Sequence, residues 1–162
     1  GGVFLTHNTK YMVQGALIAG IYIVLTLAFG FMGFGPVQFR LSEVLTVLPY
    51  FTPAAIPGLF IGCLFSNFLG GAHQLDVIFG SLATLLAAYV SYHLRKKPYL
   101  VPLPPVVVNM IVVPIILKIT ANVPFWMTVF TVGLGQVAAC YGLGYPFMLL
   151  LKKYGYKIFN RK

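Results

Sequence analysis

Charged residues are scarce in this sequence, and acidic residues are nearly absent. Of its 162 residues only 8% are charged, and Asp and Glu together occur twice. A typical soluble domain has about 25% charged residues. Because 59% of the residues are hydrophobic, the chain lacks the polar side chains needed to cover a water-facing surface. The composition therefore predicts a membrane protein and excludes a water-soluble enzyme.

The clusters of reactive groups that enzymes use are also missing. Cys63 and Cys140 lie in apolar runs without a C-x-x-C motif or a histidine at ligand spacing, so we expect two packed thiols and no metal or cofactor. No G-x-x-x-x-G-K-[ST] phosphate loop is present, so the chain has no means of hydrolysing ATP by itself. We expect no enzymatic activity. The net charge of +9 forms no basic stripe with interleaved aromatics, so no nucleic acid partner is expected either.

Uncharged runs long enough to cross a bilayer recur along the chain. A hydrocarbon core of about 30 Å needs about 20 helical residues. Residues 11–30, 77–94, 99–117 and 125–151 meet or approach this length, and we expect the last run to break at Pro146. Prolines within 40–69 exclude one straight helix there and favour two, over 41–48 and 53–69. The sequence thus predicts an all-α, single-domain bundle of six transmembrane helices.

The distribution of cations predicts the orientation of this bundle. Six spans put both termini on one side, and the positive-inside rule makes that side cytoplasmic. Arg40 and Lys118 then lie outside, and the remaining cations lie inside, where they contact lipid head groups: Lys10, Arg95, Lys96, Lys97, Lys152, Lys153, Lys157, Arg161 and Lys162. Residues 1–9 form an N-terminal extension whose first two glycines could derive from cloning, and 152–162 form a basic cytoplasmic tail.

The two acids are candidate site residues because ionisable groups are costly near a membrane-spanning helix. Arg40 and Glu43 are three residues apart, so both lie on one helical face and can pair or jointly face a ligand. An interfacial salt bridge that seats the short helix explains the pair equally well. Asp76 follows a glycine-rich exterior turn, and complementing the helix dipole is its simpler explanation.

Four amides and several aromatic residues form a second tier of candidates. Gln38, Asn67, Asn109 and Gln136 lie in or beside apolar stretches, where bonds between helices are commoner than ligand contacts. Aromatic residues such as Trp126 cluster near the predicted outer ends, where an interfacial belt explains most of them and one or two could stack on a planar ligand.

The first predicted helix also carries small residues four positions apart. Gly15 with Ala19, and Ala16 with Gly20, would let another helix approach closely. Taken alone, this common pattern favours packing within the bundle over docking to another protein.

Several longer segments together resemble the QueT family of transporter components. They are FGPVQFRLSE at 34–43, LPYFTPAAIPG at 48–58, LDVIFGSLAT at 75–84 and PLPPVVVN at 102–109, with further similarity at Gly62 and 67–71. The resemblance implies a six-helix substrate-binding (S) component of an energy-coupling factor (ECF) importer for queuosine precursors. It also implies a membrane scaffold protein (the T component) and two cytoplasmic ATPases as partners, with Gly15, Ala16, Ala19 and Gly20 as docking residues.

The ligand implied by the resemblance gives the polar residues specific roles. A 7-deazaguanine base presents a ring N–H and an exocyclic amine side by side, and one carboxylate can accept both bonds. We expect Glu43 to read this edge, with Asp76 as second choice. Arg40, Gln38 or Asn109 could donate to the base carbonyl, and the other acid could pair with an aminomethyl cation.

Three other functions remain open from the sequence. A stand-alone secondary transporter or channel for a small planar solute would need no ATPase, but no internal repeat of the kind common in such carriers is visible. A membrane enzyme acting on lipid or diphosphate substrates would need a catalytic cluster. A purely structural assembly subunit fits the composition as well, and ligand binding would distinguish it.

Overall fold

The structure is a computed structural model that describes residues 2–29 and 41–154. This part of the chain is helical and contains no strand, as predicted. The α-helices are α1 (Gly2–Ala28), α3 (Ala55–Leu69), α4 (Ser81–His93), α5 (Leu103–Ala121), α6 (Phe125–Val137) and α7 (Tyr145–Tyr154). Two 3₁₀ segments, η1 (Leu41–Tyr50) and η3 (Pro98–Leu100), and two π-helical segments, η2 (Asp76–Gly80) and η4 (Ala138–Gly144), lie between them.

The predicted helical segments are present, with differences in their bounds and geometry. The helix predicted at 11–30 already begins at Gly2 and so includes most of the predicted N-terminal extension. The short segment predicted at 41–48 is a 3₁₀ helix that continues to Tyr50. The run at 125–151 does not break at Pro146, because α6, η4 and α7 follow one another without interruption. The wider π-helical turns of η4 end at Gly144, just before the proline, and so provide space for a ring that would clash in a regular helix. The expected break is therefore a local widening of one long helix.

Within residues 2–29 and 41–154, three of the helices are long and apolar enough to cross a membrane: Thr9–Ala28, Pro98–Ala121 and Phe125–Lys153. Helix α3 is apolar but shorter. Large hydrophobic side chains are exposed on many outward faces, for example Phe68, Ile119 and Phe130. An exposed apolar surface of this extent suits contact with lipid.

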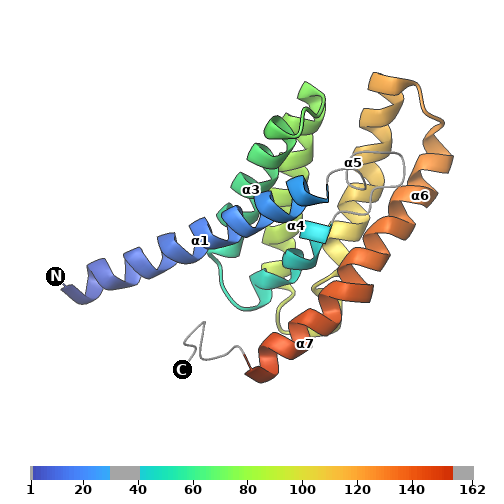
Figure 1. Cartoon of the computed structure of the whole chain (residues 1–162). Helices are drawn as coiled ribbons and strands as arrows, with labels where there is room; N and C mark the ends of the chain where they lie inside the picture. The colour runs from blue at the N-terminus through green and yellow to red at the C-terminus, as the bar shows by residue number, and fades with distance from the viewer. Residues whose placement is uncertain (1, 30–40, 155–162) are drawn as a thin grey trace.

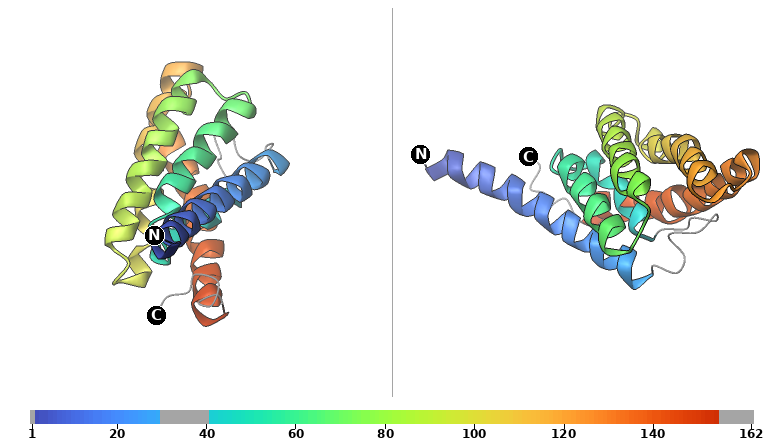
Figure 2. Two further views of the ribbon diagram at one scale, coloured as in Figure 1. Left: turned by 90° about the vertical axis from the view of Figure 1, so that its left-hand side faces the viewer. Right: turned by 90° about the horizontal axis from the view of Figure 1, so that it is seen from above.

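The helices pack mostly in chain order. Helix α3 contacts α4, α4 contacts α5, and α5 contacts α6 (Figure 1). Helix α1 crosses α3 obliquely, and its N-terminal half extends beyond the other helices (Figure 2). Helix α7 continues the direction of α6 toward the opposite end of the molecule. The buried core lies where α1, η1, α3 and α7 meet and includes Tyr22, Val47, Leu59 and Met148.

Two glycines of α3 allow the close crossing with α1. A Cβ atom at Gly58 would lie 2.8 Å from the Gly15 carbonyl oxygen, and one at Gly62 would lie 2.8 Å from the Tyr22 Cβ. A methyl carbon does not approach an oxygen atom or another carbon atom this closely unless the two are covalently bonded. The Gly58 and Gly62 positions therefore fix how deeply α1 sits against α3, and through it the position of Tyr22.

Substituting Gly62 by Ala should destabilise the protein by about 1–3 kcal/mol, because the added methyl group must push α1 away from α3. Gly20→Ala is the matched control, since a Cβ there meets no atom within 4 Å. Thermal melting of the two variants in the same detergent checks this expectation. Equal melting temperatures would contradict the packing argument.

Candidate functional site

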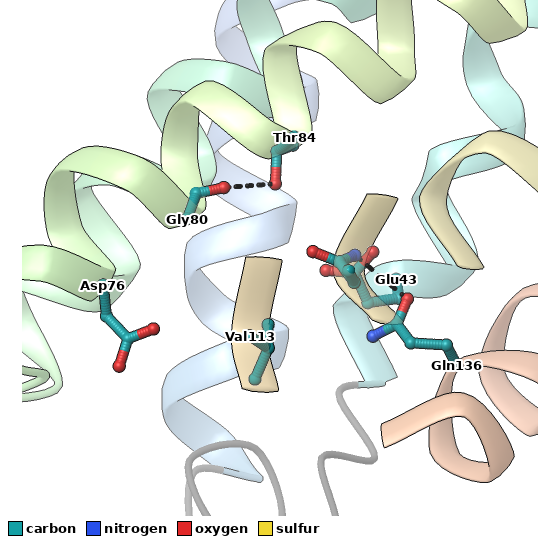
Figure 3. A pocket seen from close by; sticks show the side chains of 7 residues that line it. Glu43, Asp76, Gly80, Thr84, Val113 and Gln136 are labelled. Carbon is teal, nitrogen blue, oxygen red and sulfur yellow. Dashed lines mark hydrogen bonds between the residues drawn. The ribbon is translucent and has the colours of Figure 1, made fainter. Parts of the chain in front are cut away.

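Residues from two irregular helical segments and three regular helices line a small polar pocket. Its lining consists of Glu43, Asp76, Gly80, Thr84, Asn109, Val113 and Gln136. Glu43 comes from η1 and Asp76 from η2, and Gln136 stands just before η4 (Figure 3). Short 3₁₀ and π-helical segments inside helical proteins often occur at functional sites. Two such segments supply both acids of an apolar bundle to this pocket, and a third begins just after Gln136, which makes the pocket the candidate site.

The two carboxylates belong to different walls of the pocket. Figure 3 shows Asp76 and Glu43 on opposite sides, with Val113 between them in that view. The cavity volume is about 10 Å³. This is room for roughly one water molecule and is much less than a bicyclic base requires. The walls must therefore separate before a ligand of that size can enter.

Glu43 is almost completely buried, with 2% of its surface exposed. The Tyr22 hydroxyl of α1 donates a hydrogen bond to its Oε1 atom at 2.8 Å. The Thr46 hydroxyl donates to the Glu43 backbone oxygen at 2.6 Å. A buried carboxylate needs such donors because removing it from water is costly. Side-chain and backbone contacts thus hold this residue in a defined orientation.

Asp76 is half-buried, and its backbone is held from behind by α3. Asn67 Nδ2 donates to the Asp76 backbone oxygen at 3.1 Å. Asn67 is fully buried, and its Oδ1 atom has no hydrogen-bond partner in the described part of the chain. Since Asn67 does not line the pocket, its contact supports η2 and positions Asp76 from outside the site.

The two amides of the pocket bind each other. Asn109 Nδ2 of α5 donates to Gln136 Oε1 of α6 at 3.1 Å, and both side chains are buried. The Cys140 thiol lies 3.7 Å from the same Gln136 oxygen. This bond across α5 and α6 fixes the two amide planes, so their remaining polar atoms have defined directions toward a ligand.

The structure brings together four of the eight predicted binding residues, namely Glu43, Asp76, Asn109 and Gln136. Asn67 lies behind the pocket wall. Trp126 is 79% exposed on the outer surface, where its ring packs edge-on against Phe125. The candidates Arg40 and Gln38 lie outside the described residues.

Sequence reasoning missed two polar contributors to this region. Thr84 lines the pocket, and its hydroxyl lies 3.1 Å from the Gly80 carbonyl oxygen, as the dashed line in Figure 3 marks. Tyr22 binds Glu43 from the first uncharged run, in which the sequence pattern did not single it out. The one available signal was its hydroxyl, because a tyrosine far from a helix end needs a polar partner when buried.

The predicted docking residues line an apolar groove between α1 and α3. Its volume is about 650 Å³, and it includes Gly15, Ala16, Ala19 and Gly20 with side chains of α3 such as Ile61. Ala16 and Gly20 are exposed. Ala19 is 6% exposed, because it also packs against α3 beside Gly62. Of the four residues, Ala16 and Gly20 are thus the ones that an external partner could touch without disturbing the bundle.

No group of three or more His, Cys, Asp or Glu residues that could hold a metal ion occurs within 2–29 and 41–154.

Replacing Asn67 by Leu should loosen η2, because the Asp76 carbonyl loses its side-chain donor while the number and branching of the side-chain heavy atoms stay the same. We expect hydrogen exchange of the backbone amides in 77–81 to become about fivefold faster, which corresponds to the loss of one net hydrogen bond. Ser91→Ala is the matched control, since it removes a buried bond of 2.8 Å to the Val101 carbonyl, away from η2. If both variants exchange alike in this segment, the positioning role of Asn67 is wrong.

The comparisons with known proteins agree with one another. The family model described as QueT transporter matches residues 12–153. The queuosine precursor transporter QueT of Lactococcus lactis subsp. cremoris (strain MG1363) is 30% identical over an alignment of 149 positions, which covers 83% of this chain and 88% of that protein. No solved structure matches the chain. A relative that is a transporter argues against an enzyme, and the apolar helices suit a membrane protein. On the family match over most of its length, the chain belongs to the QueT transporter family.

Proposed function

We propose that this chain is the substrate-binding S component of an ECF-type importer and captures a 7-deazaguanine base, such as 7-aminomethyl-7-deazaguanine or queuine, from outside the cell. The observation that carries this proposal is the pocket itself. The only two acids of the sequence, Glu43 and Asp76, line it together with the paired amides of Asn109 and Gln136. The name of the Lactococcus relative supports a queuosine precursor as the ligand.

The chemistry of a 7-deazaguanine base matches the polar groups of the pocket. Its ring N–H and exocyclic amine are adjacent donors, and the Glu43 carboxylate can accept both in a charge-assisted contact. Asp76 on the opposite wall would pair with an aminomethyl cation at the other end of the ligand. The amide nitrogens of Asn109 or Gln136 would donate to the base carbonyl, a role for which Arg40 and Gln38 are further candidates. A flat ligand would thus have a polar partner at each edge.

The sequence contains no phosphate-binding loop, so an ATP-driven importer built on this chain would need partner proteins that hydrolyse ATP. We propose that the scaffold T component docks on the groove between α1 and α3 and that two cytoplasmic ATPases supply the energy. The lining of this groove is almost entirely apolar, and small residues at Ala16 and Gly20 would allow a partner helix to approach closely. The neighbouring surface is also apolar, so the chain could change its tilt in the bilayer without moving many charges through lipid.

The arrangement of the helix ends supports cytoplasmic termini. The C-terminal ends of α4 and α7 lie at the same end of the molecule, which is lower in Figure 1 and in the left view of Figure 2. Arg95, Lys96 and Lys97 follow α4, and Lys152 and Lys153 belong to the last turn of α7. The turn between α5 and α6 lies at the other end, where Lys118 is the basic residue in the last turn of α5. We propose that the more basic end faces the cytoplasm.

Substituting Glu43 by Gln should weaken binding of 7-aminomethyl-7-deazaguanine at least tenfold, or about 1.4 kcal/mol, because an amide nitrogen would then face one donor of the base. Isothermal calorimetry on the detergent-purified protein measures this change. Asp76→Asn is the companion variant. It should also weaken binding of 7-aminomethyl-7-deazaguanine, but it should leave the affinity for a ligand without the aminomethyl group unchanged. Unchanged binding by Glu43→Gln would contradict the role of this residue.

Replacing Gly20 by Leu should leave ligand binding intact and reduce uptake at least tenfold, because the side chain fills the groove but meets no atom of the bundle near its Cβ. Uptake is measured in cells that also produce the scaffold and ATPases. Leu86→Val, on an exposed apolar face of α4, is the control for a general effect on membrane insertion. Uptake by the unmodified chain in cells lacking the ATPases would instead favour a stand-alone transporter.

A further inference from the structure

Hydrogen bonds between side chains join helix α1 to η1 and to the residues just after it. Thr52 Oγ1, two residues past the end of η1, donates to Gln14 Oε1 at 2.9 Å. At the start of η1, the Tyr22 hydroxyl donates to Glu43 Oε1 at 2.8 Å, and the Thr26 hydroxyl donates to Ser42 Oγ at 2.7 Å. The last two lie next to the pocket and are buried. A 3₁₀ helix of ten residues is unusually long and has poorer hydrogen-bond geometry than an α-helix. The placement of η1 therefore depends on side chains of α1.

The same helix carries the apolar groove on its other face. Gly20 lines the groove, and Tyr22 lies two residues further on, which is roughly 200° around an α-helix. Gly20 is exposed, whereas Tyr22 has none of its surface exposed. A helix is stiff over such a short distance. A partner that moves this part of α1 must therefore move the Tyr22 hydroxyl with it.

The packing of Tyr22 leaves little freedom to compensate for such a movement. The base of its side chain fits against Gly62, where a single added carbon would lie 2.8 Å from the Tyr22 Cβ. The groove is formed by α1 together with Gly58, Ile61 and Phe65 of α3. A partner seated there touches both helices and acts on the contact that fixes the position of Tyr22.

We propose that Tyr22 is a positioning residue that couples the groove to the ligand site. While α1 rests on α3, the Tyr22 hydroxyl holds Glu43 in the pocket. A scaffold protein that shifts α1 withdraws this hydroxyl from Glu43 and so lowers the affinity of the chain for its ligand. This inference rests on the proposed function. It supplies a release step for a chain that has no ATP site of its own, since the binding energy of the partner loosens the carboxylate. By thermodynamic linkage, the ligand changes the affinity for the scaffold by the same factor.

The test compares ligand affinity in the free chain and in its complex with the scaffold and ATPases, using 7-aminomethyl-7-deazaguanine and Tyr22→Phe. For the unmodified chain we expect at least fivefold weaker binding in the complex. Tyr22→Phe keeps the ring but removes the hydroxyl, so the free variant should bind the ligand about three- to tenfold more weakly than the free unmodified chain. The affinities of this variant in the free chain and in the complex should then be nearly equal. Tyr89→Phe makes the same change at an exposed position of α4 and should behave as the unmodified chain.

The outcomes separate this inference from the proposed function. If the unmodified chain binds no deazapurine, both fail. If it binds the base but affinity is the same in the complex, or Tyr22→Phe retains the full difference, only the coupling through Tyr22 is overturned. Should Tyr22→Phe not fold, Gly62→Ala carries the test, because the added carbon would lie 2.8 Å from the Tyr22 Cβ and so shifts Tyr22 without removing its hydroxyl; a full difference between the free chain and the complex would again overturn the coupling.

Discussion

The structure depends on how a negative charge is kept inside an apolar bundle. Glu43 is buried, and an isolated carboxylate in such surroundings would be strongly destabilising. The Tyr22 hydroxyl of α1 donates to this carboxylate, and the packing of α1 on the glycines of α3 fixes where that hydroxyl lies. Removing the donor leaves the charge less well solvated, whereas removing the charge leaves the tyrosine without its acceptor. The close crossing of two helices and the placement of one acid are therefore parts of one arrangement.

Departures from regular helix geometry position the other polar groups. In η2 the π-helical turns bring Asp76 and Gly80 to the pocket, and Asn67 of α3 binds the Asp76 carbonyl. In η4 the same geometry follows Gln136 and accommodates Pro146. A regular helix satisfies its own carbonyls and keeps a strict period, whereas widened turns shift side chains relative to that period. The two acids of the site thus lie where the helices are irregular, whereas its threonine and two amides lie on the regular helices α4, α5 and α6.

The sequence predicted the residues that composition makes rare, and it missed those that only packing defines. Glu43, Asp76, Asn109 and Gln136 stand out because an apolar chain has few polar groups, and all four meet at the pocket. Tyr22 could not be found in this way, since its hydroxyl alone does not identify its partner, which lies 21 positions away. Proline predicted a break at 146, but the preceding turns absorb the ring. Contacts between distant segments and small changes in helical geometry are not encoded in a local pattern.

The central claim is that a buried carboxylate, held by a tyrosine, recognises the donor edge of a flat base in the QueT family. The most direct test compares 7-aminomethyl-7-deazaguanine with an analogue that keeps the aminomethyl group but lacks the exocyclic amine beside the ring N–H. Binding of each to the purified chain is measured by calorimetry. The analogue without the amine should bind at least about tenfold more weakly, because it offers the carboxylate one donor in place of two. Equal affinity for the two ligands would contradict the account.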